Sequence, residues 1–406
     1  MGMRIGLNLL GLTPRLSGGI DLYAQNLVQA LGDGQSAGAE FVLFCNADNA
    51  PAFQRLMRNR PGWTVLGSRV TARPQVARVL AEQFALPILA RRSGVDLLHS
   101  LSYTWPIASS CRGVVTVCDM LYAVWPEGVP LAKRLFWRAA IPLSVRRCEH
   151  TITISESARR DIVRLLKIDT GKVSITYLAG CVTPPHGGVA ESAIEAAAGK
   201  YARRSRRFLL SVGALGLHKN PGPMVAAFAR LRARAEFQDL HLVLAGIDYG
   251  MRRKILDDIV RRGLQHAVSL AGYVPVEELR ALYAGASVYL STSLMEGFGM
   301  TAVEAMGFGT PVVVSNRGAL PEIVADGGVV VDPLQPDDIA DAAAGILSNP
   351  HRAEELSAAA RRRAGEFSWS RTAAETRAVY EKVLQGAVDP EWRAGTWIRD
   401  SQSPQS

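Results

Sequence analysis

Short apolar stretches alternate with longer amphipathic stretches along most of the chain. In the first half, the apolar stretches predict strands, and the amphipathic stretch after Gly19 predicts a helix that ends near Leu31. A second series of the same kind begins at Phe208. The predicted strands are Met3–Leu9, Glu40–Phe44, Leu97–His99, Val114–Val117, Thr151–Ile154, Val173–Tyr177, Phe208–Val212, His241–Ala245, Val268–Ala271, Ser287–Ser291, Pro311–Ser315 and Val329–Val331. Because short strands that alternate with helices are typical of parallel sheets, the pattern predicts an α/β fold with two doubly wound domains.

Proline and glycine separate the two series. The sequence Pro184-Pro-His-Gly-Gly188 interrupts the alternation, and an Ala-rich, partly helical stretch follows it. Because Pro and Gly favour turns and linkers, we expect the chain to change domains here. The predicted divisions are an amino-terminal domain over residues 1–185, a hinge or linker over 186–205, a second domain over 206–369, an amphipathic helix over 370–386 and a tail over 387–406.

Two carboxylates flank a Gly-rich turn in the second domain. Glu296 precedes the turn 297–299, and Glu304 lies in the helix-prone stretch that follows it. Amides at a helix N-terminus have no intrahelical acceptor, and the helix dipole favours an anion there. The N–H groups of Met300 and Thr301 are therefore candidates for binding a diphosphate. Alternatively, Thr301 and Glu304 form a capping box, which satisfies helix amides without contacting a ligand.

A longer motif surrounds this turn. Seven residues separate Glu296 from Glu304, and Gly309-Thr-Pro311, a strand and the stretch 316–322 follow them. In this order of elements the sequence resembles the retaining glycosyltransferases of family four. The resemblance implies the GT-B fold, in which two Rossmann-like, doubly wound domains face a central cleft. It also implies that the helix over 370–386 crosses back to the first domain.

Within the motif, the resemblance implies a role for each carboxylate. Glu296 would face the transferred sugar, and Glu304 would hold the ribose hydroxyls of a nucleotide-sugar donor. A carboxylate suits the second role because an ionised acceptor strengthens hydrogen bonds from two neighbouring hydroxyls. The backbone between the two carboxylates would wrap the sugar and its diphosphate, and its residues are Gly297, Phe298, Gly299, Met300 and Thr301.

Other donor contacts are predicted outside the motif. By the same resemblance, Lys219 would bind the donor diphosphate, and Gly19 would let the first domain approach it. Many relatives carry an Arg just before this lysine, where this chain has His218. A protonated His218 would replace that charge in part. The backbone at Tyr273 and Val274 would meet the nucleobase, although backbone contacts do not identify the base.

The first domain is predicted to supply the acceptor side of the cleft. Where relatives have His-Asp after a strand, this chain has Cys118-Asp119, and Asp119 is expected to position the acceptor. The strand at Leu97–His99 is predicted to deliver His99 to the cleft at its carboxyl end. Gly18, Cys118 and His99 are therefore predicted near the acceptor or the transferred sugar. Cys118 is a poor candidate for a nucleophile, because no His/Asn pairing pattern accompanies it.

Composition and charge add expectations about location and partners. No apolar run approaches the roughly eighteen residues of a membrane span, and the amino end lacks a signal peptide, so we expect a cytoplasmic protein. The 5 cysteines include no CxxC pair, which fits reduced thiols. Residues 1–185 carry 21 Lys and Arg against 12 Asp and Glu, whereas residues 186–406 carry 25 of each. We expect no nucleic-acid partner.

The basic first domain suggests an anionic acceptor, or peripheral contact with an anionic membrane at the inner face of the plasma membrane. The alternative is that the charge serves only solubility. The stretch Leu131–Arg147 interleaves basic and apolar residues at helical spacing, so it either lies on a bilayer or packs on the core. On a bilayer, aromatic residues would insert and cations would meet headgroups, namely Phe136 or Trp137 and Lys133, Arg134 and Arg138.

These patterns predict an enzyme that moves a hexose, such as mannose, from a nucleoside-diphosphate sugar to a hydroxyl of a glycan or lipid-linked acceptor. Retention through a front-face mechanism follows from the resemblance, with catalysis assigned to Glu296, Lys219 and Asp119. No metal or cofactor is expected, because Lys219 and the helix dipole neutralise the diphosphate and no DxD pair is evident. The alternatives are a nucleotide-sugar epimerase or hydrolase of the same fold, and a non-catalytic glycan-binding relative.

Overall fold

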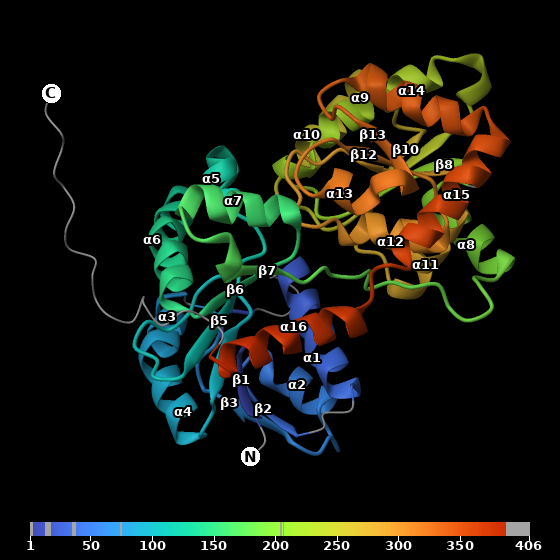
Figure 1. Cartoon of the computed structure of the whole chain (residues 1–406). Helices are drawn as coiled ribbons and strands as arrows, with labels where there is room; N and C mark the ends of the chain where they lie inside the picture. The colour runs from blue at the N-terminus through green and yellow to red at the C-terminus, as the bar shows by residue number, and fades with distance from the viewer. Residues whose placement is uncertain are drawn as a thin grey trace, which may run out of the picture.

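The computed structural model describes residues 3–12, 18–34, 38–73, 75–203, 205 and 207–386. Two α/β units lie side by side, and each is built around a parallel sheet covered by helices (Figure 1). The predicted tail at 387–406 lies outside the described residues. The prediction of two doubly wound α/β domains is confirmed.

The first domain holds a seven-stranded parallel sheet in the order β3-β2-β1-β4-β5-β6-β7. Its strands are β1 Met3–Asn8, β2 Ala39–Cys45, β3 Trp63–Gly67, β4 Leu97–Ser100, β5 Arg112–Thr116, β6 His150–Thr153 and β7 Val173–Ile175. Its helices are α1 Gly19–Asp33, α2 Ala50–Leu56, α3 Gln75–Leu80, the π-helical η1 Ala81–Ala85, α4 Leu86–Arg92, α5 Leu121–Val124, α6 Leu131–Arg147 and α7 Glu156–Leu166, with 3-10 turns η2 Pro126–Gly128 and η3 Thr170–Lys172.

The second domain holds a six-stranded parallel sheet in the order β10-β9-β8-β11-β12-β13. Its strands are β8 Phe208–Val212, β9 His241–Ala245, β10 Val268–Gly272, β11 Val288–Ser291, β12 Val312–Ser315 and β13 Gly328–Val331. Its helices are α8 Glu191–Tyr201, α9 Pro221–Arg232, α10 Arg252–Arg261, α11 Val276–Gly285, α12 Met300–Phe308, α13 Leu320–Val324, α14 Pro336–Leu347 and α15 Pro350–Ala364, with 3-10 turns η4 Leu217–Lys219, η5 Ala235–Phe237 and η6 Ala325–Gly327.

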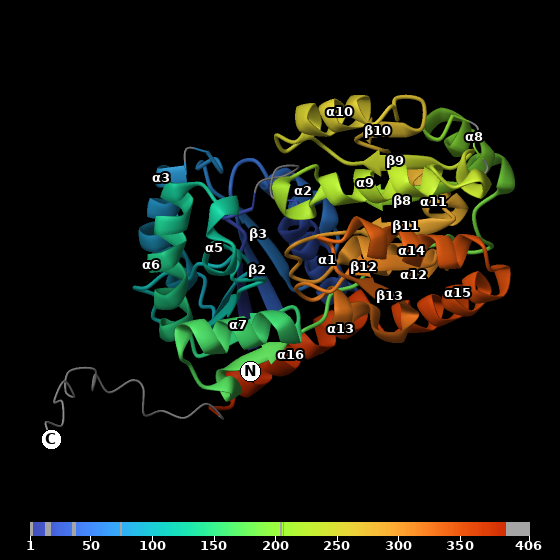
Figure 2. The same cartoon turned by 90° about the horizontal axis from the view of Figure 1, so that it is seen from above.

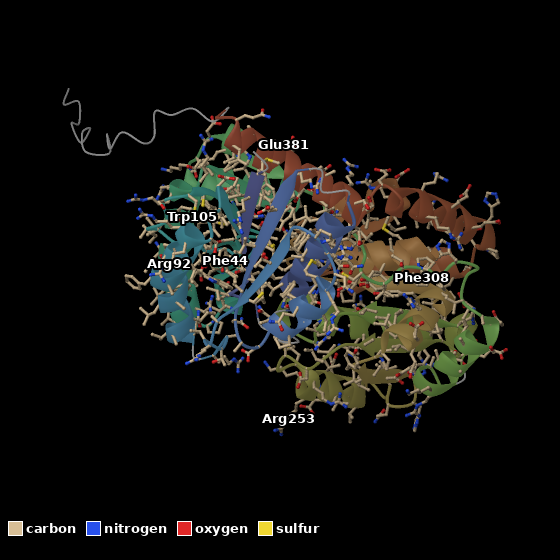
Figure 3. All side chains as sticks on the ribbon, turned by 90° about the horizontal axis from the view of Figure 1, so that it is seen from below. Phe44, Arg92, Trp105, Arg253, Phe308 and Glu381 are labelled. Carbon is tan, nitrogen blue, oxygen red and sulfur yellow. The ribbon has the colours of Figure 1, made fainter. Side chains whose placement is uncertain are left out.

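Each sheet is buried on both faces, as its apolar strands require. The central strands β1, β2, β4 and β11 end in runs of buried residues, and such near-continuous apolar strands are typical of parallel sheets between helices. Figure 3 shows Phe44 inside the first domain and Phe308 inside the second, and both side chains are buried. The polar cleft residues therefore lie where strands end, beyond these cores.

The strand β3 was missed by the sequence pattern. It lies at the edge of the first sheet and pairs with β2, and most of its residues are only half-buried. An edge strand of five residues carries little apolar alternation, so its pairing partner decides its conformation. Trp63 stacks on Phe41 of β2 with ring centroids 4.3 Å apart, and this contact helps to hold the strand in place.

The predicted linker over 186–205 is too long, because part of it belongs to the second domain. Helix α8 packs against α11, and Ala197 and Tyr201 are buried in the core of the second sheet. Lys200 forms an ion pair with Glu278 of α11 at 2.8 Å, and Tyr201 donates to the same carboxylate. The Ala-rich composition thus reflects close helix packing, and the crossing between domains lies before Glu191.

Helix α16 (Trp369–Leu384) returns from the second domain and packs along the first, beside α1 (Figures 1 and 2). Its Thr372 hydroxyl donates to the carbonyl of Tyr177 at 2.6 Å, and its Trp369 indole donates to the carbonyl of Gly180 at 3.1 Å. A second tie between the domains is made by α13, where Glu322 accepts hydrogen bonds from the first amides of α7. These contacts fasten the two domains to each other.

Candidate active site

Glu296 and Lys219 form an ion pair where two strands of the second sheet end. Lys219 closes the turn η4 after β8, and Glu296 lies in the turn after β11. The Lys219 Nζ donates to the Glu296 Oε2 at 2.7 Å, and the two side chains are 23% and 19% exposed. Because β8 and β11 are paired, the sheet brings together two residues that lie far apart in the sequence. The pair is therefore largely shielded from solvent.

A glycine that the sequence reasoning missed fixes the position of Glu296. Gly318 adopts a positive φ of 63°, and a Cβ there would lie 2.6 Å from the carbonyl oxygen of Glu296. The next amide, from Ala319, donates to that same carbonyl at 2.9 Å. A side chain at position 318 would therefore displace the backbone that carries Glu296.

Lys219 is the cation of this site, and His218 is not. Burial opposes ionisation of Glu296, but the charge and hydrogen bond of Lys219 outweigh it and lower the pKa of Glu296. Burial and the neighbouring Lys219 both lower the pKa of His218. A lowered pKa favours the neutral imidazole, so Lys219 supplies the positive charge beside Glu296, and the contact of His218 with a diphosphate stays a prediction.

Glu304 has a different environment, inside the second domain. It is 5% exposed, and its Oε1 accepts from the amides of Cys181 and Val182 at 2.9 and 3.2 Å. Its Oε2 accepts from the Tyr283 hydroxyl at 2.7 Å. Burial raises the pKa of Glu304. The carboxylate thus fastens the crossing segment of the chain to α12, and the predicted contact with ribose hydroxyls stays a prediction.

The capping-box alternative for Thr301 and Glu304 is wrong. Helix α12 begins at Met300, with Gly299 at the N-cap position and no side-chain hydrogen bond at the cap. Thr301 therefore lies inside the first turn, and its hydroxyl bonds to the Tyr289 hydroxyl at 2.7 Å. Gly299 has φ 103°, a conformation that a residue with a side chain adopts only with strain.

The N-termini of two helices meet across the cleft. Gly19, predicted to approach the donor, is the first residue of α1, and Gly18, predicted near the acceptor or the transferred sugar, is its N-cap residue with φ 56°. A Cβ on Gly19 would lie 3.1 Å from the Cε of Met300, the first residue of α12. Both helix ends present amides without intrahelical acceptors, and both dipoles favour an anion. This arrangement suits a diphosphate between the two domains.

Asp119 lies on the opposite wall of the cleft, against the Gly-rich turn. A Cβ on Gly297 would lie 3.1 Å from the carbonyl oxygen of Cys118 and 3.6 Å from the Cβ of Asp119. Asp119 accepts from the Tyr103 hydroxyl and from the amide of Leu121, both at 3.0 Å. Burial raises the pKa of Asp119, and the charge of Glu296 raises it further. Tyr103, which the sequence did not single out, orients this carboxyl group.

Cys118 remains a thiol in the protein. Its side chain is 5% exposed, burial raises its pKa, and the charge of Asp119 raises it further. A thiol of this kind does not ionise near neutral pH, so it cannot attack a sugar as a nucleophile. Its place beside Gly297 makes it part of the wall that contacts the Gly-rich turn.

The placement of His99 at the cleft is wrong. Its side chain is fully buried between the first sheet and α16, and burial lowers its pKa to about 3. One ring nitrogen bonds to the Tyr380 hydroxyl at 2.7 Å and the other to the Thr116 hydroxyl at 2.8 Å. Both nitrogens are therefore occupied, because α16 covers the end of β4. His99 supports the packing of α16 and is not an acceptor-site residue.

The remaining predicted donor residues are partly structural. The Phe298 ring is buried and contacts Phe367 edge to face, with centroids 5.5 Å apart, so only its backbone can face a ligand. Tyr273 follows β10 and is 73% exposed, whereas Val274 is buried. The contact of their backbone with a nucleobase stays a prediction.

Helix α6 packs one of its candidate membrane-inserting aromatic residues against the first domain. Trp137 packs between Tyr103 and Tyr122, with centroid distances of 5.5 and 6.3 Å, and Lys133 lies over its ring at 4.3 Å. Trp137 is therefore unavailable for insertion into a bilayer, and Lys133 belongs to the cleft wall near Asp119. The exposed apolar side chains of this helix are instead Leu131, Leu135 and Leu143.

The described residues hold neither a metal-binding cluster nor a helix of membrane-spanning character. Among them, His, Cys, Asp and Glu form no group of three or more that could hold a metal ion. Over the same part of the chain, none of the helices has the length and apolar character of a membrane span.

Comparisons with known proteins agree with this geometry. The family described as "Glycosyl transferases group 1" matches residues 194–363, and the family described as "Glycosyltransferase Family 4" matches residues 17–179. The MMP alpha-(1->4)-mannosyltransferase of Mycolicibacterium hassiacum is 31% identical over 319 residues, which cover 76% of this chain and 74% of the relative. The O-antigen chain mannosyltransferase B of Escherichia coli is 29% identical, and the match covers 66% of this chain and 70% of that relative. The chain belongs to the family-four glycosyltransferases.

Structural similarity extends over nearly the whole chain. The crystal structure of Anabaena Alr3699/HepE in complex with UDP and glucose has a TM-score of 0.72 and 18% identity. The match covers 94% of this chain and all of that one. It confirms the GT-B fold. The chain is thus a glycosyltransferase with GT-B architecture, related to enzymes of surface-glycan synthesis.

Proposed function

We propose that this enzyme transfers a hexose, with mannose as the first candidate, from a nucleoside-diphosphate sugar to a hydroxyl of a glycan or lipid-linked acceptor with retention of configuration. The observation that carries the proposal is the Lys219–Glu296 ion pair, which lies beside the N-terminus of α12 and faces Asp119. The mannosyltransferase names of two relatives support the sugar, and the complex of HepE with UDP and glucose supports the donor class.

The mechanism follows from where charge develops. When the glycosidic bond breaks, the leaving diphosphate gains negative charge, and preformed positive groups stabilise that change most strongly. We assign this role to Lys219 and to the amides of Met300 and Thr301, which lie in the first turn of α12. The acceptor hydroxyl attacks the anomeric carbon from the face that the diphosphate leaves, and its proton passes to the departing phosphate oxygen. Each bond made replaces one broken on the same face, which retains configuration.

Each carboxylate has a separate part in this scheme. Glu296 orients the hydroxyls of the transferred sugar and holds Lys219 beside the leaving group. Asp119 accepts the hydroxyl of the acceptor through the carboxyl group that Tyr103 positions. We also propose that no metal cofactor takes part, because the lysine and the helix N-termini supply the positive charge. Activity that is unchanged in a chelator would support this, and restoration by Mg²⁺ or Mn²⁺ would contradict it.

Peripheral contact with an anionic membrane belongs to the same proposal. Exposed apolar side chains follow α3, η1 and α4, namely Val76, Leu80, Phe84, Ile88 and Leu89, and Leu131 and Leu135 continue them on α6. The acidic residue of Gln75–Arg92, Glu82, is buried, and α6 contains none, whereas both stretches carry several arginines. Figures 1 and 2 show α3 and α6 on the side of the first domain away from the second. Apolar residues flanked by cations favour an anionic interface.

The test begins with the donor. A thermal-shift panel of GDP-, UDP- and ADP-sugars should identify one base, because a ligand at a hundred times its dissociation constant stabilises the protein by about 2.7 kcal/mol. NMR of the product formed with that donor should show the anomeric configuration of the donor. No stabilisation by any nucleotide sugar would refute the donor class. An epimerised or hydrolysed donor without transfer, or glycan binding without turnover, would replace the proposal by one of the other two functions.

A further inference from the structure

A second group of cations lies at the carboxyl edge of the first sheet, apart from Lys219. Arg78 of α3 reaches the loop after β1, where its Nη1 would lie 3.2 Å from a Cβ on Gly11. The Ser102 hydroxyl borders the same glycine, and its buried Oγ has no hydrogen-bond partner among the described residues. Gly11 therefore leaves a guanidinium and an unpaired hydroxyl next to each other at the end of two strands.

Lys133 continues this group toward Asp119. Its Nζ lies 4.3 Å from the ring centroid of Trp137, which packs on Tyr103. Tyr103 follows Ser102 directly and donates to Asp119 at 3.0 Å. One wall thus runs from the predicted acceptor carboxyl past Lys133 to Arg78, and Arg78 is close enough that its charge acts on Lys133.

The carboxylates near these cations are already engaged. Glu82 is 1% exposed, accepts from Asn8 at 3.2 Å and from Thr104 at 2.7 Å, and forms an ion pair with Arg78 at 3.4 Å. Burial raises the pKa of Glu82, and Asp119 likewise has its pKa raised by burial. Arg78 has Glu82 as its counter-ion, and the charge of Asp119 acts on Lys133, but Arg78 and Lys133 still repel each other. An anion bound between the two cations would relieve that repulsion.

The backbone of this wall is strained where it turns toward the cleft. Tyr103 has φ 58°, in the left-handed region, where a bulky residue is a clear outlier. The hydrogen bond from the Tyr103 amide to the Thr116 carbonyl, at 2.9 Å, holds it there. Such strain persists at ligand sites when the surroundings enforce it. Here the Ser102 hydroxyl lies beside Gly11 and Arg78, whereas the Tyr103 hydroxyl donates to Asp119.

We propose that Arg78, Lys133 and Ser102 bind a phosphoryl group carried by the acceptor, while Asp119 receives the acceptor hydroxyl. A guanidinium presents two parallel N–H groups to phosphate oxygens, and an ammonium and a hydroxyl add further donors. The inference rests on the proposed function, because it assigns the acceptor to the first domain. Phosphate recognition can nevertheless be measured without turnover, so the two can fail separately.

The experiment compares two soluble probes, mannose 1-phosphate and methyl α-mannoside, by isothermal titration calorimetry. The donor site is first saturated with the nucleoside diphosphate that the thermal-shift panel identifies, so that Lys219 is occupied. We expect the phosphorylated probe to bind about tenfold tighter or more, since charge-assisted hydrogen bonds are the strong ones. Arg78→Gln and Lys133→Gln should each remove about tenfold of that difference, and Arg78→Lys should retain part of it.

Arg253→Gln is the matched control. Arg253 is an exposed arginine on α10 of the second domain (Figure 3), whereas the proposed phosphate site lies in the first. The Arg253→Gln variant should show the same difference in affinity between the two probes as the parent. Lys133 is exposed, so its variant keeps the test decisive if Arg78→Gln does not fold. Equal binding of the two probes by the parent, or a preference that survives both glutamine variants, would overturn the inference.

Two further measurements distinguish a lipid-linked acceptor from a free sugar phosphate, and test the phosphate site separately from the proposed function. A sugar linked through a diphosphate to a short prenyl chain should bind tighter than mannose 1-phosphate if the natural acceptor is lipid-linked, and no tighter if it is a free sugar phosphate. Either result supports the inference, provided that both glutamine variants weaken the binding. A parent that binds phosphate here but fails to bind any nucleotide sugar would refute the proposed function and leave the phosphate site standing.

Discussion

The two carboxylates of the motif lie eight positions apart and occupy opposite environments. Glu296 is 19% exposed, forms an ion pair with Lys219 and has a lowered pKa. Glu304 is 5% exposed, accepts only neutral donors and has a raised pKa. Neither difference is visible in the local sequence. The charge of Lys219 keeps Glu296 ionised, whereas Glu304 is hydrogen-bonded to the segment that connects the two domains.

This contrast indicates that one carboxylate of the motif serves catalysis, whereas the other also stabilises the fold. Burial disfavours a charged carboxylate, and nearby cations and donated hydrogen bonds oppose that effect. At Glu304 the hydrogen bonds do not outweigh burial. Glu296 has such a cation because β8 and β11 are paired, and Glu304 has none among its hydrogen-bond partners. We therefore expect Glu296 and its partner to control turnover, and Glu304 to control both nucleotide binding and stability.

The largest expected effect comes from removing the cation. Lys219→Ala should lower kcat by about a hundredfold or more, because the diphosphate gains charge as the glycosidic bond breaks. Nucleotide affinity should fall less, which steady-state kinetics and calorimetry together would reveal. His218→Ala is the control and should keep most of the turnover, since its pKa is lowered. Equal kcat in Lys219→Ala and the parent would remove Lys219 from the mechanism.

Glu304 should show its effect in binding and stability instead. Glu304→Ala should weaken nucleotide binding by about 2–3 kcal/mol and also destabilise the fold, because three buried donors lose their acceptor. Tyr283→Phe removes only one of these donors and should cost less than about 1.5 kcal/mol of unfolding free energy. A Glu304→Ala variant with a lower melting temperature but unchanged nucleotide affinity would make this residue purely structural.

The pH dependence of stability should differ in sign between the two carboxylates. The stability that Glu296 contributes is present above its ordinary pKa of 4.5 and is lost as the pH falls through its lowered pKa. The contribution of Glu304 is complete below 4.5 and is lost as the pH rises through its raised pKa. Urea unfolding of the parent, Glu296→Gln and Glu304→Gln across this range measures both. Parallel pH profiles for the two variants would contradict the comparison.

The smallest effect on nucleotide binding should come from substitutions on the exposed apolar face of the first domain. Replacing Leu80, Phe84 and Ile88 with Ser should weaken binding to anionic vesicles by at least about tenfold, because buried methylene groups supply the interfacial affinity. Nucleotide binding should not change. Leu256→Ser on α10 is the matched control for an exposed leucine. Equal sedimentation of the parent with neutral and anionic vesicles would refute the membrane contact.

Local sequence was sufficient to predict most strands of the two sheets, and the Gly-rich turn and helix start of the candidate site. The predicted strands lie within two residues of the observed ones at each end, because strand periodicity and breaking residues act over a few neighbouring positions. The Gly-rich turn and the start of a helix near Met300 follow from glycine conformation and helix propensity in the same way. The edge strand β3 escaped because its stability depends on its neighbour β2.

Tertiary structure decided what the polar side chains do. His99 is buried because α16, which begins 270 residues later in the chain, covers it. Glu304 accepts hydrogen bonds from two other segments of the chain, through Cys181 and Val182 and through Tyr283. Lys133 faces Asp119 because Trp137 packs into an aromatic cluster. Local propensities fix which backbone segments form, but burial, charge pairing and pKa depend on elements that meet only when the whole chain has packed.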